Sequence, residues 1–222
     1  MPTTNPSPRI RFQWKYFDQV SPIVIDGIPN IVNIGCADDP VQLDDLALHV
    51  DIDDWSYKHT YFHQADAHDL PGKWARQFEL VILGDILEHV VDPMKVIDEA
   101  ARVTAVNGCL VMTVFEEWRL PGPGQWIEES HKIADKVNQE MGYEDREDYQ
   151  RVHYPKRVGV PDDSETPHLS HINQFTDEDM NGLVTWVLRD GDFRLVEGTK
   201  AYEQTLEGHD WYNWLFAFER LR

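Results

Sequence analysis

Short runs of apolar, mostly branched residues recur along the first half of the chain and predict buried β-strands. Most of these runs are followed by a glycine or an acidic residue. The expected strands are residues 31–34, 46–52, 61–65, 80–83 and 110–115. Because such runs suit strands buried on both faces, we expect a parallel sheet whose strands are joined by right-handed crossovers with helices.

Two segments follow the helical period instead. Asp92 caps the first free amides of the first helix, and Pro93 starts it without losing a hydrogen bond. Apolar residues then recur at helical spacing, and Gly108 is the expected stop. The second helix is expected to run from a capping sequence at Thr176 to Gly191.

The end of the chain predicts two closing strands, 194–199 and 211–218, as an antiparallel pair at the sheet edge. The expected fold class is therefore α/β. It is a Rossmann-like doubly wound sheet, mostly parallel with an antiparallel edge strand, and helices cover both faces.

Four segments follow from this pattern. Residues 1–25 form a tail and an aromatic flap, and 26–115 form the cofactor-binding Rossmann-like core. Residues 116–170 lose the periodicity and are expected to be a lid or substrate insertion, and 171–222 return to the same domain. The flap holds four aromatic residues, Phe12, Trp14, Tyr16 and Phe17, which either pack on the domain or stack on a planar ligand.

Charge narrows the possible partners. The chain of 222 residues has 20 Lys and Arg against 40 Asp and Glu, a formal net charge of -20. Such an acidic protein repels phosphate backbones and anionic lipid, so we expect a small-molecule partner and neither nucleic acid nor membrane. No apolar run approaches the ~20 residues that span a bilayer, and no export signal is evident. We therefore expect a cytoplasmic protein, and the oligomeric state stays open.

Polar side chains gather where the expected strands end. Asp85, Glu88 and His89 follow the buried run 80–83 at spacings that would place them on one helical turn. In open α/β sheets this edge binds ligands. Asp51 follows the turn at Gly35 at the end of the next strand, the arrangement that offers a carboxylate to ribose hydroxyls.

These motifs together resemble the class I S-adenosylmethionine-dependent methyltransferases. The resemblance rests on Ile34-Gly35-Cys36, Val50-Asp51-Ile52, Asp66-Ala67-His68-Asp69-Leu70-Pro71, residues 78–93 and the run from Ala101 to Gly108. The sequence Leu87-Glu88-His89-Val90, followed by Asp92-Pro93, is similar to the branch with small-molecule and ubiquinone-pathway O-methyltransferases.

The resemblance implies S-adenosylmethionine as cofactor and assigns residues to it. Asn33 and Gly35 would border its methionine part, with Asp85 nearby. Asp51 would bind the ribose hydroxyls, and Asp66 would hold the adenine. Cys36, Ile52 and Ala67 adjoin these positions and complete the expected cofactor-binding set.

The first loop departs from the family pattern of an acid followed by three alternating glycines. Those positions hold Asn33, Gly35, Ala37 and Asp39. The change puts tight cofactor binding in question, although Asp38 or Asp39 could pair with the cofactor's ammonium group. It weighs further against a nicotinamide dehydrogenase, because pyrophosphate needs glycine amides and is repelled by carboxylates.

The chemistry of the triad stays open between three interpretations. His89 could be the catalytic base with Glu88 beside it, because an imidazole titrates near neutral pH. Both could instead brace the helix and loop. A divalent metal on Asp85, Glu88 and His89 is possible but not expected; its candidate fourth ligands are His131, His153, His168 and His171.

The predicted function is an S-adenosylmethionine-dependent methyltransferase that modifies an oxygen of a small polar or carbohydrate-like acceptor. One alternative is a protein that binds S-adenosylmethionine with little or no catalysis, which the altered first loop favours. A metal-dependent 2′-O-methyltransferase of RNA is a further alternative, and the acidity weighs against it.

Overall fold

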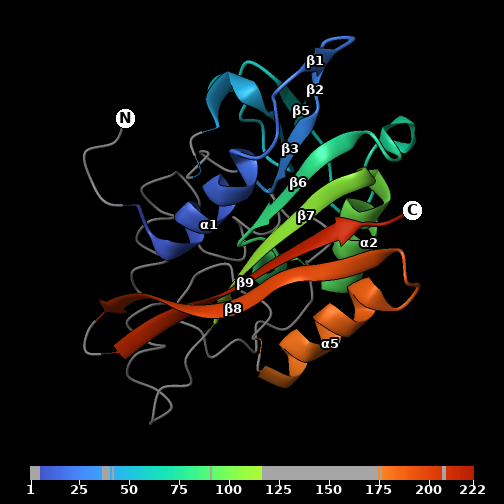
Figure 1. Cartoon of the computed structure of the whole chain (residues 1–222). Helices are drawn as coiled ribbons and strands as arrows, with labels where there is room; N and C mark the ends of the chain where they lie inside the picture. The colour runs from blue at the N-terminus through green and yellow to red at the C-terminus, as the bar shows by residue number, and fades with distance from the viewer. Residues whose placement is uncertain are drawn as a thin grey trace, which may run out of the picture.

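One seven-stranded sheet organises the molecule (Figure 1). The computed structural model describes residues 6–36, 41, 43–90, 92–116, 175, 177–206 and 209–222. The sheet order is β5-β4-β3-β6-β7-β9-β8, and a separate hairpin pairs β1 with β2. The strands are β1 Val24–Ile25, β2 Ile28–Pro29, β3 Ile31–Ile34, β4 Leu48–Asp51, β5 Phe62–Gln64, β6 Phe78–Gly84, β7 Thr104–Glu116, β8 Phe193–Leu206 and β9 His209–Arg220.

The sheet is doubly wound. β3 pairs in parallel with β4 on one side and with β6 on the other. The chain therefore moves outward from β3 through β4 to β5, and then returns to continue on the opposite side through β6 and β7. The loops leaving β3 and β6 diverge at this switch point, which is where open α/β sheets bind ligands.

Helices cover both faces of the sheet. α1 (Pro8–Phe17) packs on one face through Ile10, Phe12 and Tyr16. α2 (Pro93–Val103) and α5 (Asp177–Leu188) pack on the other. Figure 1 shows α1 across the sheet from this pair. The predicted aromatic flap is thus a helix whose aromatic side chains contribute to the core.

The antiparallel pairing is confined to one side of the sheet. β9 runs antiparallel to both β7 and β8, and every other neighbouring pair in the seven-stranded sheet is parallel. The predicted fold class, a mostly parallel Rossmann-like sheet with an antiparallel edge, is confirmed. Among the described residues, no helix is long and apolar enough to cross a membrane.

Two local predictions were wrong. Gly108 does not end a helix, because α2 stops at Val103 and Gly108 lies within β7. A Cβ at Gly108 would come within 2.8 Å of the Ala105 carbonyl oxygen, so close backbone approach requires glycine there. The crossovers near β4 are also shorter than expected: the described part of the β3–β4 connection holds only the 3-10 turn η1 (Asp44–Leu46).

Candidate functional site

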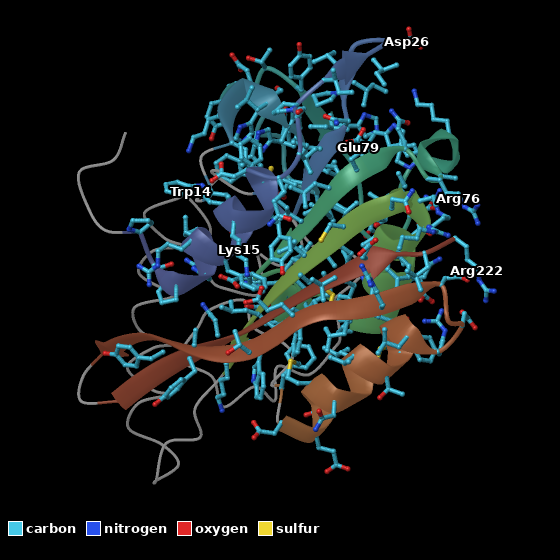
Figure 2. The ribbon with its side chains drawn as sticks, in the orientation of Figure 1. Trp14, Lys15, Asp26, Arg76, Glu79 and Arg222 are labelled. Carbon is cyan, nitrogen blue, oxygen red and sulfur yellow. The ribbon has the colours of Figure 1, made fainter. Side chains whose placement is uncertain are left out.

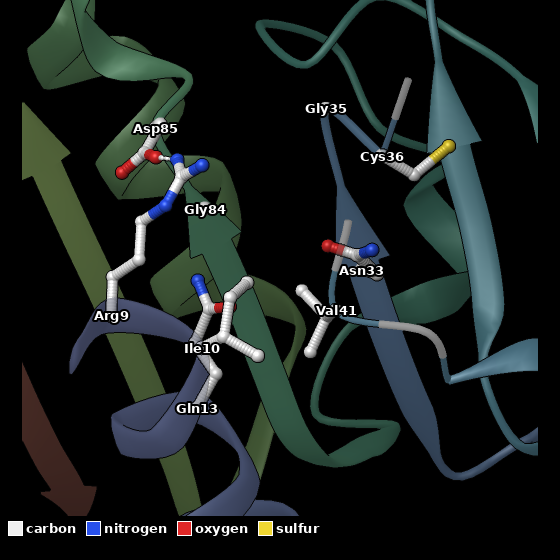
Figure 3. A pocket seen from close by; sticks show the side chains of 9 residues that line it. All are labelled: Arg9, Ile10, Gln13, Asn33, Gly35, Cys36, Val41, Gly84 and Asp85. Carbon is white, nitrogen blue, oxygen red and sulfur yellow. Dashed lines mark ion pairs between the residues drawn. The ribbon is translucent and has the colours of Figure 1, made fainter. Parts of the chain in front are cut away.

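A small pocket lies at the switch point, beneath the start of α1. The carboxyl end of β3 contributes Asn33, Gly35 and Cys36, and the end of β6 contributes Gly84 and Asp85. Arg9, Ile10 and Gln13 of α1 and Val41 complete the lining (Figure 3). The pocket encloses about 10 Å³, roughly the space of one water molecule.

Both strand ends leave the sheet through left-handed backbone. Gly35 has φ +72°, and a Cβ there would overlap Ile86, coming within 2.5 Å of its Cδ1 atom. Asp85 has φ 51° although it carries a side chain. Backbone strain of this kind costs about 1–3 kcal/mol and clusters at functional sites. In Figure 3 the Asp85 carboxylate points toward the guanidinium of Arg9.

Asp85 is the point where α1 joins the site. Its carboxylate forms an ion pair with Arg9 and accepts a hydrogen bond from Thr113 Oγ1 at 2.7 Å. Thr113 in turn accepts from Gln13 Nε2 at 3.1 Å. The Arg9 and Gln13 contacts were not predicted, because these two residues of an aromatic segment belong to no recognised motif.

The last turn of α1 is held against the edge strand β8. Tyr16 donates to Glu197 Oε2 at 2.8 Å, and Lys15 pairs with the same carboxylate; Lys15 is labelled on α1 in Figure 2. Burial first, and then the bond to Glu197, raise the pKa of Tyr16 well above its usual range. The Lys15 bond is the main factor that lowers the pKa of Glu197. These contacts fix α1 to β8.

Asp51 and Ile52 close β4 on the same edge of the sheet. Asp51 Oδ1 accepts a hydrogen bond from the Asp53 amide at 3.0 Å, which shapes the turn after the strand. Gln64 Nε2, at the end of β5, donates to the Ile52 carbonyl at 2.9 Å. Asp51, the residue predicted to bind the ribose, therefore lies at a hydrogen-bonded turn beside the end of β3.

Asp66 follows β5 and is oriented by His68. Asp66 Oδ1 accepts from the His68 amide at 2.9 Å and lies 2.6 Å from His68 Nδ1. The Asp92 amide donates to His68 Nε2 at 3.2 Å. With Nε2 accepting, the hydrogen is on Nδ1, so His68 links Asp66 to the start of α2. Ala67 lies inside this turn.

A partly buried ion pair fixes the end of the same loop. Glu99 of α2 contacts Arg102 at 2.7 Å and accepts from the Leu70 amide at 2.9 Å. Arg102 Nη2 donates to the Leu70 carbonyl at 2.9 Å. Burial raises the pKa of Glu99, but the bonds from Arg102 and Leu70 outweigh it and hold that pKa below its ordinary value. The pair clamps the segment that carries Asp66.

The Glu99→Gln variant is expected to be less stable at neutral pH by about 1–3 kcal/mol, because it loses a charge-assisted contact in a buried position. A lowered folded-state pKa stabilises the protein above the unfolded pKa, and this contribution is lost as pH falls through the folded value. Urea denaturation at several pH values should therefore show the gap between wild type and variant closing in acid.

Glu79, exposed on β6 and labelled in Figure 2, supplies the control. Glu79→Gln is expected to change the free energy of unfolding by less than about 0.5 kcal/mol at every pH. If the difference in free energy of unfolding between wild type and Glu99→Gln stays constant down to acid pH, the stabilising role of the Glu99–Arg102 pair is contradicted.

Glu88 and His89 lie in the 3-10 turn η3 (Leu87–His89) after β6. The spacing predicted one helical turn for both together with Asp85, but Asp85 lies before η3 in left-handed backbone. Glu88 is only 1% exposed, and His89 is half-buried. Neither lines the pocket with Asp85. Among the described residues, the convergent group of potential metal ligands lies elsewhere, so the structure does not support the possible Asp85, Glu88 and His89 metal site.

Some predicted residues lie outside the described part of the chain. They are the loop positions Ala37, Asp38 and Asp39, the insertion beyond residue 116, and the four candidate fourth ligands His131, His153, His168 and His171. Their roles stay predictions.

Comparison with known proteins gives one family match. Residues 39–112 match a family model described as a methyltransferase domain, and these residues include β4, β5, β6 and the carboxylates at or just after their ends. Over this third of the chain, the sequence is similar to methyltransferase domains. No curated protein matches its sequence.

Solved structures of methyltransferases share the fold. An S-adenosylmethionine-dependent methyltransferase from Methanosarcina mazei is 16% identical, with TM-score 0.50 over 86% of this chain and 92% of that one. A putative methyltransferase from Bacillus halodurans is 12% identical, with TM-score 0.52 over 93% and 97%. The N-methyltransferase NodS from Bradyrhizobium japonicum, in complex with S-adenosyl-L-homocysteine, is 13% identical, with TM-score 0.53 over 99% and 90%. At these identities the likeness concerns the fold.

The residues at this edge fit S-adenosylmethionine, the cofactor that the resemblance implies. Asp51 closes β4 and Asp66 follows β5, where carboxylates would accept hydrogen bonds from ribose and adenine, and Asp85 supplies a negative charge in the pocket at the end of β6. The enclosed space is small, and Arg9 and Gln13 of α1 line it. Arg9 already brings a cation to Asp85. For the methionine end of the cofactor to enter, α1 would therefore have to give way.

Proposed function

We propose that this methyltransferase transfers a methyl group to an oxygen of a small polar or carbohydrate-like acceptor. The observation that carries the proposal is the switch-point pocket, where Asn33, Gly35 and Asp85 meet beside the acids that close β4 and β5. The net charge of -20 favours a small acceptor over RNA.

The cofactor-binding residues then divide by strand. The methionine part is bordered by Asn33, Gly35 and Cys36 after β3, and its ammonium group faces Asp85 after β6. The ribose is bound by Asp51 with Ile52 at the end of β4. The adenine is held by Asp66 with Ala67 after β5. When bound, S-adenosylmethionine supplies an activated methyl group on a sulfonium. The chain contributes orientation, because displacement requires donor and acceptor in line.

Asp85 connects cofactor binding to α1. Its carboxylate is paired with the Arg9 guanidinium in this arrangement, and the ammonium group of the cofactor is the same kind of partner. With the cofactor bound, Asp85 would hold the cofactor's ammonium group in place of Arg9. Arg9 would then be available to the methionine carboxylate, which it attracts by charge.

His89 is the proposed base that accepts the proton from the acceptor hydroxyl. Its half-buried imidazole lies in η3, which follows β6. Glu88 is buried in the same turn, and we assign it the role of holding η3 in place. A positioned imidazole contributes about 10²–10⁴ to the rate of such a step.

The His89→Gln variant should lose that factor while binding S-adenosylhomocysteine as wild type does. Radiolabelled methyl transfer from S-adenosylmethionine into a small-metabolite pool measures turnover, and calorimetry measures binding. His63→Gln, on the exposed face of β5, is the control and should transfer at the wild-type rate.

The product distinguishes the alternatives. NMR of the labelled product should show the new methyl group on oxygen, and methyl on nitrogen or carbon would overturn the choice of atom. Cofactor binding without transfer into any fraction would indicate a binding protein with little or no catalysis. Product lost on nuclease treatment would indicate RNA as the acceptor.

A further inference from the structure

A second group of reactive side chains lies beside the cofactor pocket. Cys36, His49 and His59 each offer one potential ligand atom, and these atoms all lie within 4.8 Å of one another. The three side chains are 1%, 0% and 9% exposed. Cys36 also lines the cofactor pocket, but Figure 3 shows its sulfur pointing away from Asp85.

Three separate parts of the chain meet in this group. Cys36 follows the end of β3, His49 lies within β4, and His59 precedes β5. The ring of His59 stacks on the ring of His49, with their centroids 4.0 Å apart, and its centroid lies 6.2 Å from that of the Phe62 ring. The sequence analysis did not predict this group, because the separations of 13 and 10 residues between its members match no common ligand spacing.

We propose that Cys36, His49 and His59 bind a zinc ion. A thiolate and two imidazoles are a ligand set that zinc prefers, at about 2.3 Å for sulfur and 2.0–2.1 Å for nitrogen. Their tetrahedral arrangement separates ligand atoms by about 3.5 Å. The group therefore needs to close by roughly 1 Å, and a water takes the fourth position.

The imidazole rings set the main geometric requirement. They are nearly parallel, at 12°, whereas the lone pair of each ring nitrogen lies in the plane of its ring. For both nitrogens to bind one ion at the shared edge of the stacked rings, one ring must rotate so that its lone pair points at the ion. We assign the rotation to His59, because its backbone lies in a loop, while His49 lies in β4 between β3 and β5.

The ion would tie the cofactor loop to the sheet. The Cys36 and Gly35 amides already donate to the Val50 carbonyl, at 3.2 and 2.8 Å. A zinc ion adds a side-chain connection from Cys36 to β4 and to the loop before β5. Such an anchor would hold the end of β3 in place where the usual loop glycines are replaced. The zinc site itself does not depend on the proposed acceptor.

Metal analysis of the untagged full chain tests the proposal. After reconstitution with zinc chloride and removal of excess metal, mass spectrometry should find about one zinc per chain. Replacement by Co²⁺ should give the charge-transfer absorption of a cobalt–thiolate bond, which requires no variant. Cys36→Ser should abolish that absorption and weaken zinc binding by more than about a hundredfold, exceeding the loss of an outer-shell partner.

Matched controls separate ligation from general damage. Cys109 is the other thiol; burial first, and then Glu219, raise its pKa to about 12, so Cys109→Ser should keep the zinc. His59→Gln should lose it, and His63→Gln should retain it. The proposal would be overturned if the reconstituted wild-type protein held no zinc. It would also be overturned if the cobalt-substituted protein lacked the cobalt–thiolate absorption, or if Cys36→Ser retained zinc.

Discussion

Asp51→Asn is expected to weaken S-adenosylhomocysteine binding by about ten- to a hundredfold, as measured by calorimetry. The carboxylate can accept from both ribose hydroxyls, and the amide retains one acceptor and loses the charge. Because the Asn oxygen can still accept from the Asp53 amide, the turn after β4 is preserved. The loss in affinity therefore reports the carboxylate itself.

Asp54→Asn is the matched control. Asp54 is exposed, and its Oδ1 accepts from the Ser56 amide at 2.9 Å in a turn of the same kind. The substitution removes the same charge three residues away and should change the affinity less than about threefold. Equal losses in the two variants would indicate a general charge effect and contradict the assignment of Asp51.

Gly35→Ala is expected to destabilise the fold and abolish measurable cofactor binding. The left-handed backbone costs a non-glycine residue about 1–2 kcal/mol, and the new methyl group would overlap the side chain of Ile86. Overpacking adds about 1–3 kcal/mol. Urea denaturation should therefore show a total loss of about 2–5 kcal/mol, together with loss of the calorimetric signal.

Gly27→Ala isolates the backbone contribution. Gly27 has φ +80° in the β1–β2 turn, and a Cβ there meets nothing within 4 Å. This variant should lose only the conformational cost and should bind S-adenosylhomocysteine normally. If the two variants are equally destabilised and both bind, the close approach to Ile86 is not what requires glycine at position 35.

Much of the fold could be predicted because its strands are buried on both faces. The run 80–83 has no polar side chain, and Leu80, Val81, Ile82 and Leu83 are all fully buried in β6. The alternation of strand and helix patterns predicted the mostly parallel sheet, whereas the order of its strands was not predicted. The positions of three carboxylates follow from the strands: Asp51 closes β4, Asp66 lies two residues after β5, and Asp85 directly follows β6.

The rest depends on contacts that no local pattern contains. Arg9 reaches Asp85 across 76 positions of sequence, and Glu99 holds Leu70 from another element. His49 lies between the apolar residues Leu48 and Val50 in β4, so the sequence gives no sign of its partner. The structure shows that its ring stacks on the ring of His59. Gly108 was misread because helix stops and close backbone approach both favour glycine.

Hydrogen–deuterium exchange with and without S-adenosylhomocysteine tests the central claim most directly, because it locates the cofactor on the chain. Protection is expected around residues 33–36, 51–53 and 65–68, at the ends of β3, β4 and β5, and at 84–86 after β6. Amides of α1 should change as Arg9 leaves Asp85. Binding without protection at these strand ends, or protection confined to β8 and β9, would contradict the assignment of the cofactor to the switch point.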